Sequence, residues 1–171
     1  MADSQQALLV IDVQRELFRK PVPIYRGDEL LANILTLVKK AHAAGVPVIY
    51  VQHESKAGLI RGSEGWQLHP KLKPLKKDVL IEKSHPSALE GTGLAEQLAL
   101  RKVKRLVVTG LVTHRCVRAT SLDALARGFD VVLVTDAHSN YHAKAAHVVS
   151  EWNEKLKAAG VRGVAAAAVR F

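Results

Sequence analysis

Short apolar runs of strand length recur along the whole chain. Each run is continuous rather than alternating in polarity, which is typical of strands buried on both faces of a parallel sheet. The runs cover residues 7–11, 46–51, 79–81, 106–109, 131–135 and, more weakly, 163–169. The pattern therefore predicts five or six buried strands.

Helical patterns separate these runs. Apolar residues at helical spacing fall within 30–41, 94–99, 116–126 and 148–156, and Gly45, Gly128 and Gly160 stand where three of these helices would end. Strands that alternate with helices predict an α/β fold, in which helices cover both faces of a mostly parallel sheet through right-handed crossovers.

One segment breaks the alternation. Residues 54–77 are rich in Gly, Lys and Pro, contain one Trp and show no clear period. A connection of that length inside a compact domain is usually functional, as a lid or a binding loop. No repeat, low-complexity segment or linker interrupts the rest, so we expect one domain over residues 1–171.

Composition narrows the class of partner. The chain has 171 residues, 48% apolar and 24% charged, and its 25 Lys and Arg against 16 Asp and Glu give a net charge of +9. The basic residues are scattered and no nucleic-acid motif accompanies them, so we expect a small-molecule substrate and no nucleic-acid or membrane partner. The polar N-terminus and the short first apolar run lack the features of a signal peptide, which favours a cytoplasmic location.

Three reactive side chains follow predicted strands. Asp12 comes directly after the first, Lys83 after the third, and the single cysteine, Cys116, stands near the start of a helix after the fourth. Ligands of open α/β sheets bind at the carboxyl ends of the strands, so the three groups are expected to converge. A helix N-terminus is expected to lower the pKa of the thiol, which makes Cys116 a candidate nucleophile with Asp12 as base and Lys83 as electrostatic support.

Each of these residues also has an ordinary structural interpretation. A lone cysteine is often a small buried hydrophobe, an aspartate after a strand often caps a turn, and a lysine there is often a solvated charge. Hydrolysis of an amide, hydrolysis of an ester or lactam at the same site, and a non-catalytic binding protein with a basic surface all remain open on the residues alone.

Longer segments around these residues carry a resemblance. They read Ala7-Leu-Leu-Val-Ile-Asp12-Val-Gln14, then Lys83-Ser-His-Pro-Ser87-Ala-Leu89, then Val108-Thr-Gly110-Leu-Val-Thr113-His-Arg-Cys116-Val117, followed by Thr120, Asp123-Ala124 and Gly128. In this order they resemble the isochorismatase-like cysteine hydrolases, the superfamily of nicotinamidases, N-carbamoylsarcosine amidase and ureidoacrylate amidohydrolase. The match runs from about residue 7 to residue 137.

The resemblance implies a three-layer fold with a six-stranded sheet and an enzyme that cleaves a small amide through a thioester. It implies that Asp12, Lys83 and Cys116 are the catalytic residues and that a cis peptide bond joins Leu111 to Val112. That bond would place the Val112 N–H beside the Cys116 N–H as an oxyanion hole. No cofactor is implied for this sequence, and many relatives are dimers or larger, so a homo-oligomer is expected.

Departures from the family pattern are also informative. Nicotinamidases bind a metal through an Asp-x-His pair and a distant histidine, whereas the corresponding stretch here reads Val51-Gln52-His53-Glu54, so no metal is expected. True isochorismatases lack the nucleophilic cysteine, and Cys116 argues against their chemistry. His114 and Arg115 stand where nicotinamidases usually carry an Asp and an aromatic residue or His.

The remaining histidines and tryptophans give further expectations. His53, Trp66 and His114 are expected to bind substrate, because they flank the reactive edge or lie in the long loop. Asn140 resembles a helix N-cap, which would leave His138 in a loop, so His138 and His142 are interpreted as surface or capping residues. Trp152 shares a helical stripe with Val148 and Leu156 and is expected in the core or in a subunit interface.

Overall fold

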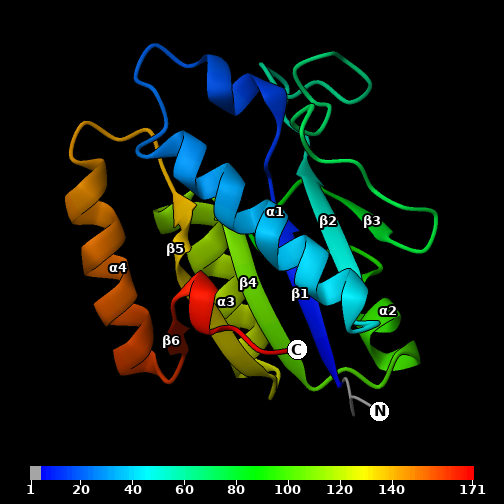
Figure 1. The fold of residues 1–171 in the computed structure, drawn as a ribbon. Coiled ribbons are helices and arrows are strands. Elements are labelled where there is room, and N and C mark those ends of the chain that lie inside the picture. Colours follow the sequence, from blue (N-terminus) through cyan, green and yellow to red (C-terminus); the bar gives the residue numbers. More distant parts are fainter. Residues whose placement is uncertain (1–4) are drawn as a thin grey trace.

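A computed structural model describes residues 5–171 of the chain, and its centre is a six-stranded sheet (Figure 1). Neighbouring strands pair in parallel throughout, in the order β3-β2-β1-β4-β5-β6. The strands are β1 (Gln6–Ile11), β2 (Val48–His53), β3 (Val79–Lys83), β4 (Arg105–Leu111), β5 (Asp130–Ser139) and β6 (Arg162–Val164). The α/β fold with a parallel sheet is confirmed.

Helices cover both faces of the sheet. On one face, α1 (Gly27–Ala43) crosses the strands in front (Figure 1), and its apolar side joins one of the two buried clusters. On the other face lie α2 (Leu94–Leu100), α3 (Arg118–Ala126) and α4 (Ala145–Ala159), which contribute to the second cluster. The three layers predicted from the alternating pattern are therefore present.

The first strand shows why its sequence is apolar at every position. Residues 7–11 are fully buried, with Leu8 and Val10 in the cluster beneath α1, and Leu9 and Ile11 in the cluster on the opposite face. Side chains of a strand alternate between faces, so a strand that is covered on both faces needs no polar position. The sheet thus places the end of β1 deep in the molecule.

The sheet reverses its winding direction at β1. The chain moves from β1 to β2 and β3 on one side, and then crosses to β4, β5 and β6 on the other. The crevice at such a reversal lies beyond the carboxyl ends of the strands and is the usual ligand site of this architecture. Ile11 pairs with Gly110 there, and Gly110 has φ +118° and a position where a Cβ would collide with the Ile11 carbonyl oxygen. Glycine lets the two backbones approach closely.

Two elements differ from the sequence-based prediction. The weak final run is a strand only over Arg162–Val164, after which Ala166–Ala168 form a 3₁₀ turn, and the Ala166 N–H donates to Asp136 Oδ1 at 2.7 Å. The helix expected from residue 116 begins as a π turn, Thr113–Val117, which then continues into α3. Alanine-rich and mixed segments fit either structure locally, and tertiary contacts decide between them.

The long segment between β2 and β3 lies near the carboxyl end of the sheet. Leu59 and Leu72 anchor it in the core beneath α1, and Leu68 forms an isolated antiparallel bridge with Gln14. It therefore lies beside the end of β1, as a binding loop would. In the described part of the chain, no helix has both the length and the apolar character needed to cross a membrane.

Candidate active site

The carboxyl ends of three strands bring the three reactive residues together. Asp12 directly follows β1 in a left-handed conformation, with φ 51°, and Lys83 is the last residue of β3. Cys116 lies in the π turn that follows β4. A non-glycine residue at positive φ is uncommon and costs about 1–2 kcal/mol, so the surrounding structure must hold Asp12 in place. The convergence expected from the sequence is present in the structure.

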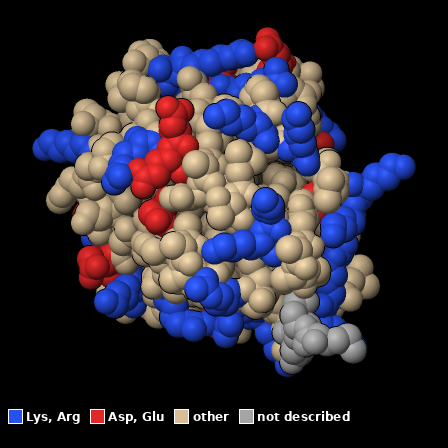
Figure 2. All heavy atoms as spheres, in the orientation of Figure 1, with Lys and Arg blue, Asp and Glu red and all other residues tan. Residues whose placement is uncertain are grey.

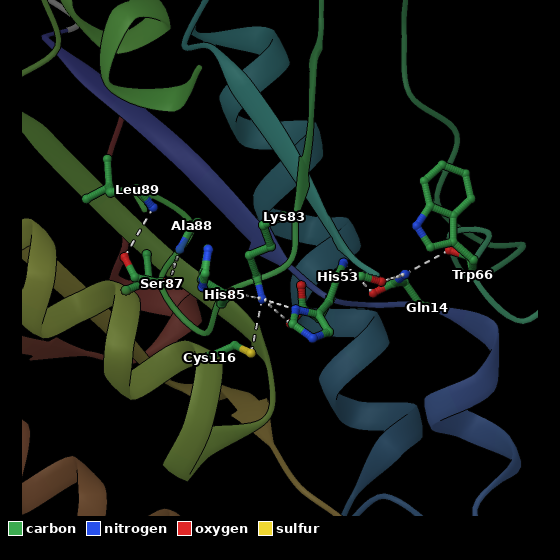
Figure 3. Close-up of polar contacts among 11 residues, drawn as sticks. Gln14, His53, Trp66, Lys83, His85, Ser87, Ala88, Leu89 and Cys116 are labelled. Atoms are coloured by element: carbon green, nitrogen blue, oxygen red, sulfur yellow. Dashed lines mark hydrogen bonds and ion pairs between the residues drawn. The ribbon is translucent and has the colours of Figure 1, made fainter. Parts of the chain in front are cut away.

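The Lys83 ammonium is the centre of this group. Its Nζ lies 3.1 Å from Asp12 Oδ2, 3.1 Å from Cys116 Sγ, 2.8 Å from His53 Nδ1 and 3.2 Å from the His85 carbonyl oxygen. Figure 3 shows the lysine reaching from β3 toward Cys116 and His53. The Lys83 side chain is 0% exposed, so a cation with no access to water is surrounded by acceptors from four residues.

Only one of the two oxygens of the Asp12 carboxylate is paired among the described residues. Oδ2 accepts from Lys83, while Oδ1 is buried and has no hydrogen-bond partner in the described part of the chain. Burial raises the pKa of Asp12 above its ordinary value, and the positive charge of Lys83 acts against that rise. A carboxylate with a raised pKa and a free oxygen is suited to accept a proton.

The Cys116 thiol is held in its protonated form. Burial and the negative charge of Asp12 raise the pKa of Cys116 to about 12, and Lys83 only partly opposes them. The expectation of a lowered pKa is therefore wrong. The thiol faces a carboxylate in a water-poor site, and these two effects outweigh the partial charge of the helix start. The resting site holds a neutral thiol beside a carboxylate.

Gln14 fixes the position of His53. Its side-chain nitrogen donates to the His53 carbonyl at 3.0 Å and to the Trp66 carbonyl at 2.8 Å, while its oxygen accepts from the His53 N–H at 2.9 Å. Figure 3 shows Gln14 between these two residues. Gln14 is fully buried. It was not identified from the sequence as a site residue, although an uncharged polar residue two positions after Asp12 could have indicated one.

A cavity of about 640 Å³ opens beside the three reactive groups. Asp12 and Cys116 lie in its wall, and so do His53 and His114, two of the residues expected to bind substrate. The other lining residues come from the segment after β1, the long loop, the Lys83 segment and the turns near α3 and α4: Leu17, Lys20, Ser55, Ala57, Leu59, Pro86, Val112, Arg115, Arg118, Ala119 and Tyr141. Loop residues 55–59 thus form part of the wall.

Trp66 does not line this cavity, which differs from the expectation. Its carbonyl accepts from Gln14 and from Gln52, and its ring extends away from His53 in Figure 3. The indole Nε1 is buried with no partner among the described residues. Trp66 therefore anchors the loop to the ends of β1 and β2, a packing role that composition alone did not separate from substrate contact.

The peptide bond between Leu111 and Val112 is cis. Val112 precedes the π turn, and its carbonyl accepts from the Arg115 N–H at 3.1 Å and the Val117 N–H at 3.3 Å. Both Val112 and Cys116 line the cavity. The two residues expected to form an oxyanion hole therefore lie at the same wall as the thiol.

His138 is buried, which corrects its interpretation as a surface or capping residue. It lies in β5, 3% exposed, and its ring contacts Thr113 Oγ1 through Nδ1 at 2.9 Å and Asn153 Oδ1 through Nε2 at 2.7 Å. Asn140 does not cap a helix: α4 begins later, and the Asn140 amide donates to Thr113 Oγ1 at 3.3 Å. The strand extends further than its apolar run because these polar groups satisfy each other.

His114 and Trp152 take different positions. His114 Nδ1 is buried without a partner in the described chain, and burial lowers the pKa of the ring, which lies 6.0 Å from the His142 ring. Trp152 is partly buried against the cluster on the α3 face, with Arg118 and Lys155 over its ring. Trp152 thus belongs to the packing between α3 and α4.

Asp12, His53 and Cys116 offer metal-ligand atoms within 4.8 Å of one another. The Lys83 ammonium already lies within 3.1 Å of one such atom on each of the three residues, so a positive charge is supplied from within the chain. Val51 stands two residues before His53, where an Asp-x-His pair would place its acid, and Gln52 between them is buried and donates to the Trp66 carbonyl. The residues present do not fit the metal site of the nicotinamidases.

Basic side chains are spread over the surface rather than gathered in one patch, as Figure 2 shows for one face. At the cavity the balance is uneven: Lys20, Arg115 and Arg118 line it, whereas Asp12 is its single acidic lining residue among those described. The cavity wall is therefore positively charged around the neutral thiol.

Comparison with known proteins gives a consistent result. The isochorismatase domain model matches residues 6–165. A streptothricin hydrolase of Streptomyces noursei is 33% identical over 148 residues, covering 85% of this chain and 59% of the relative, so the chain spans little more than half of that protein. Nicotinamidase 3 of Arabidopsis thaliana is 29% identical over 152 residues, covering 80% of this chain and 74% of the relative.

A solved structure agrees at the level of the whole chain. The isochorismatase of Pseudomonas putida KT2440 superimposes with a TM-score of 0.90 and 28% sequence identity, covering 97% of this chain and 90% of that one. The similarity therefore includes the sheet order and the helical layers described above.

Proposed function

The chain belongs to the isochorismatase family, and from this premise we propose that it is a cysteine hydrolase that cleaves a non-peptide C–N bond of a small amide. The observation that carries the proposal is the contact of one buried ammonium, Lys83, with both Asp12 and Cys116 at the wall of a cavity. A nucleophile, a base and a fixed positive charge at one point are the parts needed for acyl transfer.

The proposed reaction starts from the neutral thiol. As Cys116 Sγ attacks the acyl carbon, its proton passes to the free oxygen of Asp12, and the C–S bond forms. The Val112 and Cys116 N–H groups donate to the oxyanion that develops on the carbonyl oxygen. The positive charge of Lys83 stabilises the sulfur and the carboxylate as negative charge moves between them. Proton transfer and attack are coupled, since the pKa of Cys116 is near 12 in the resting site.

The proton on Asp12 then passes to the nitrogen of the leaving amine, and the C–N bond breaks. A thioester remains on Cys116. Asp12, a carboxylate again, accepts a proton from water, and the resulting hydroxide attacks the thioester carbon. The sulfur leaves, recovers the proton, and the acid product is released. Each residue thus returns to its starting state without a cofactor.

Substrate contacts are proposed for His53 and His114. Both line the cavity, and each has a ring nitrogen without a hydrogen-bond partner among the described residues. Burial lowers the pKa of both rings, so each is neutral at pH 7 and presents a polar group rather than a charge. Neutral histidines can orient an uncharged amide without competing with Lys83.

The test is a panel of primary amides, ureido acids and hydroxamates, with release of ammonia or hydroxylamine measured for the wild-type protein and for Cys116→Ala. We expect turnover of at least one compound by the wild type and loss of that turnover in the variant, with an unchanged far-UV circular dichroism spectrum. Activity of Cys116→Ala near the wild-type level would reject the mechanism. A serine variant, Cys116→Ser, serves as a second control, because it keeps the shape of the site but is a weaker nucleophile.

A further inference from the structure

The Lys83–His53 contact determines where the imidazole proton resides. Lys83 Nζ lies 2.8 Å from His53 Nδ1. An ammonium has three N–H donors and no lone pair, so it can only donate. Nδ1 must therefore be the acceptor, and a neutral ring that accepts at Nδ1 carries its proton on Nε2.

The ring is kept neutral by its surroundings. Burial, the charge of Lys83 and the nearby His85 lower the pKa of His53 to about 4. Lys83 and His85 both oppose a second proton on the ring. The other titratable groups that face it are Asp12, whose carboxylate is paired with Lys83, and the neutral thiol of Cys116. His53 is thus held in one tautomer over the pH range in which most enzymes work.

The Nε2 side of the ring is free. Nε2 has no hydrogen-bond partner among the described residues, yet it is not one of the polar atoms sealed from solvent. His53 lines the cavity, Gln14 fixes its backbone through the N–H and the C=O, and Lys83 holds the ring at Nδ1. A fixed N–H donor therefore faces the space beside the Cys116 thiol.

We propose that His53 is a specificity-determining donor, and that it selects amides carrying an acceptor oxygen next to the acyl group that is cleaved. A donor that the bound substrate shields from water and leaves unpaired costs binding energy, so an analogue without the acceptor is rejected. The cations Lys20, Arg115 and Arg118 at the same cavity favour an acceptor that is negatively charged, such as a carboxylate. This inference rests on the proposed hydrolase function and adds the class of substrate.

The tautomer is tested without any substrate. Nitrogen-15 NMR of histidine-labelled protein should show His53 with its proton on Nε2 and no titration between pH 5 and 8. His138 is the matched internal control, because its Nε2 donates to Asn153 independently of Lys83. In Lys83→Met the His53 signal should change to a mixture of tautomers or begin to titrate, while the His138 signal stays. A proton on Nδ1 of His53, or titration near pH 6.5 in the wild type, overturns the proposal.

The substrate class is tested with three amides of similar shape: malonamate, acetoacetamide and isovaleramide. The first offers a carboxylate, the second a keto oxygen and the third only methyl groups at the same position. Added to Cys116→Ala protein, malonamate and acetoacetamide should shift the His53 Nε2–H resonance, and isovaleramide should not. An equal shift with isovaleramide, or no shift with either acceptor compound, contradicts the proposal, and a stronger effect of malonamate identifies a charged acceptor.

Two His53 variants separate the donor from simple positioning of Lys83. In His53→Asn the side-chain oxygen can accept from Lys83 in place of Nδ1, but nothing remains at Nε2. In His53→Gln an amide N–H reaches the place of Nε2. For the acceptor-bearing amide turned over best, kcat/KM should fall 10-fold or more in His53→Asn and less in His53→Gln. The opposite order would make His53 a positioning residue for Lys83. If His53 does not carry its proton on Nε2, or if substrates without an acceptor are cleaved equally well, while Cys116-dependent turnover persists, the donor role is wrong and the hydrolase function stands.

Discussion

His53 and His138 are both buried near the carboxyl end of the sheet, and burial lowers the pKa of both. The two rings carry the same tautomer for the same reason, a donor at Nδ1: Lys83 for His53 and the Thr113 hydroxyl for His138. They differ at Nε2. The Nε2–H of His138 donates to Asn153, whereas that of His53 meets no acceptor in the described chain.

The two histidines differ because the polar groups around His138 pair with one another, whereas some of those around Lys83 do not. Around His138, Thr113, Asn140 and Asn153 satisfy one another, which stabilises the turn after β4. Around Lys83, by contrast, Asp12 Oδ1 is buried without a partner among the described residues, and His53 Nε2 has no protein acceptor there, while Asp12, His53 and Cys116 all line the cavity. A buried polar group that stays unpaired costs about 1–3 kcal/mol, so the unpaired Asp12 oxygen calls for an explanation, and the proposed role of Asp12 as proton acceptor supplies one.

The largest expected effect comes from changing Asp12, in the group around Lys83. Asp12→Asn removes the proton acceptor while keeping the shape of the side chain. Turnover of the amide identified in the panel should fall by a factor on the order of 10⁴, because nucleophile and base act as one unit. Steady-state kcat of purified protein measures the effect. A loss of less than tenfold would assign the proton transfer to another group.

Removing a hydrogen bond around His138 should lower the stability of the fold rather than the activity. Thr113→Val keeps the volume of the side chain but removes the hydroxyl that bonds to His138 and accepts from Asn140. We expect a loss of about 1–3 kcal/mol in the free energy of unfolding, measured with urea. Thr36→Val is the matched control, because the Thr36 hydroxyl bonds only to Ala32 on an exposed face of α1, and its effect should lie within about 0.5 kcal/mol of zero. Equal effects of both variants would contradict the role of the buried network.

Acid should weaken the fold through both histidines. His53 binds a proton near pH 6.5 in the unfolded chain but only near pH 4 in the folded protein. The unfolded state therefore holds more protons in that window, and the free energy of unfolding falls as the pH drops from about 6.5 to about 4. Thermal unfolding as a function of pH measures this slope. It should be shallower in His53→Gln than in the wild type, and an unchanged slope would remove His53 from the account.

The smallest expected effect is that of a chelator. Because the Lys83 ammonium lies among Asp12, His53 and Cys116, a divalent ion would have to displace it. Dialysis against EDTA should leave kcat and the melting temperature unchanged. Activity that disappears on dialysis and returns with one added metal would show that the ammonium does not hold this position in the working enzyme.

Much of this arrangement was predictable from local patterns. Continuous apolar runs and glycine-terminated helices indicated the layers, and Asp12, Lys83 and Cys116 were placed at one edge because parallel strands end together. The amino-acid sequences on either side of these three residues also resembled those of the family. These features depend on short stretches of sequence.

What could not be predicted depends on contacts between distant segments. The helix start at Cys116 suggested a low pKa, but the rise follows from burial beside Asp12, which lies 104 residues earlier in the chain. His138 and Asn140 read as polar loop residues because their partners, Thr113 and Asn153, are far away in sequence. From the sequence, Trp66 could not be distinguished from a residue of the cavity wall. Only the fold shows that its carbonyl accepts hydrogen bonds from the side chains of Gln14 and Gln52.

The electrostatic coupling of Asp12 to Cys116 is tested most directly by the rate of alkylation of the single cysteine with iodoacetamide between pH 6 and 10. With a pKa near 12, the wild-type thiol should react more slowly than a free thiol with a pKa of about 8.5, with no plateau in this range. In Asp12→Asn the negative charge is gone and Lys83 remains, so alkylation should be faster at every pH even though turnover is lost. A wild-type plateau below pH 8, or an Asp12→Asn protein that reacts no faster than the wild type, would contradict the account.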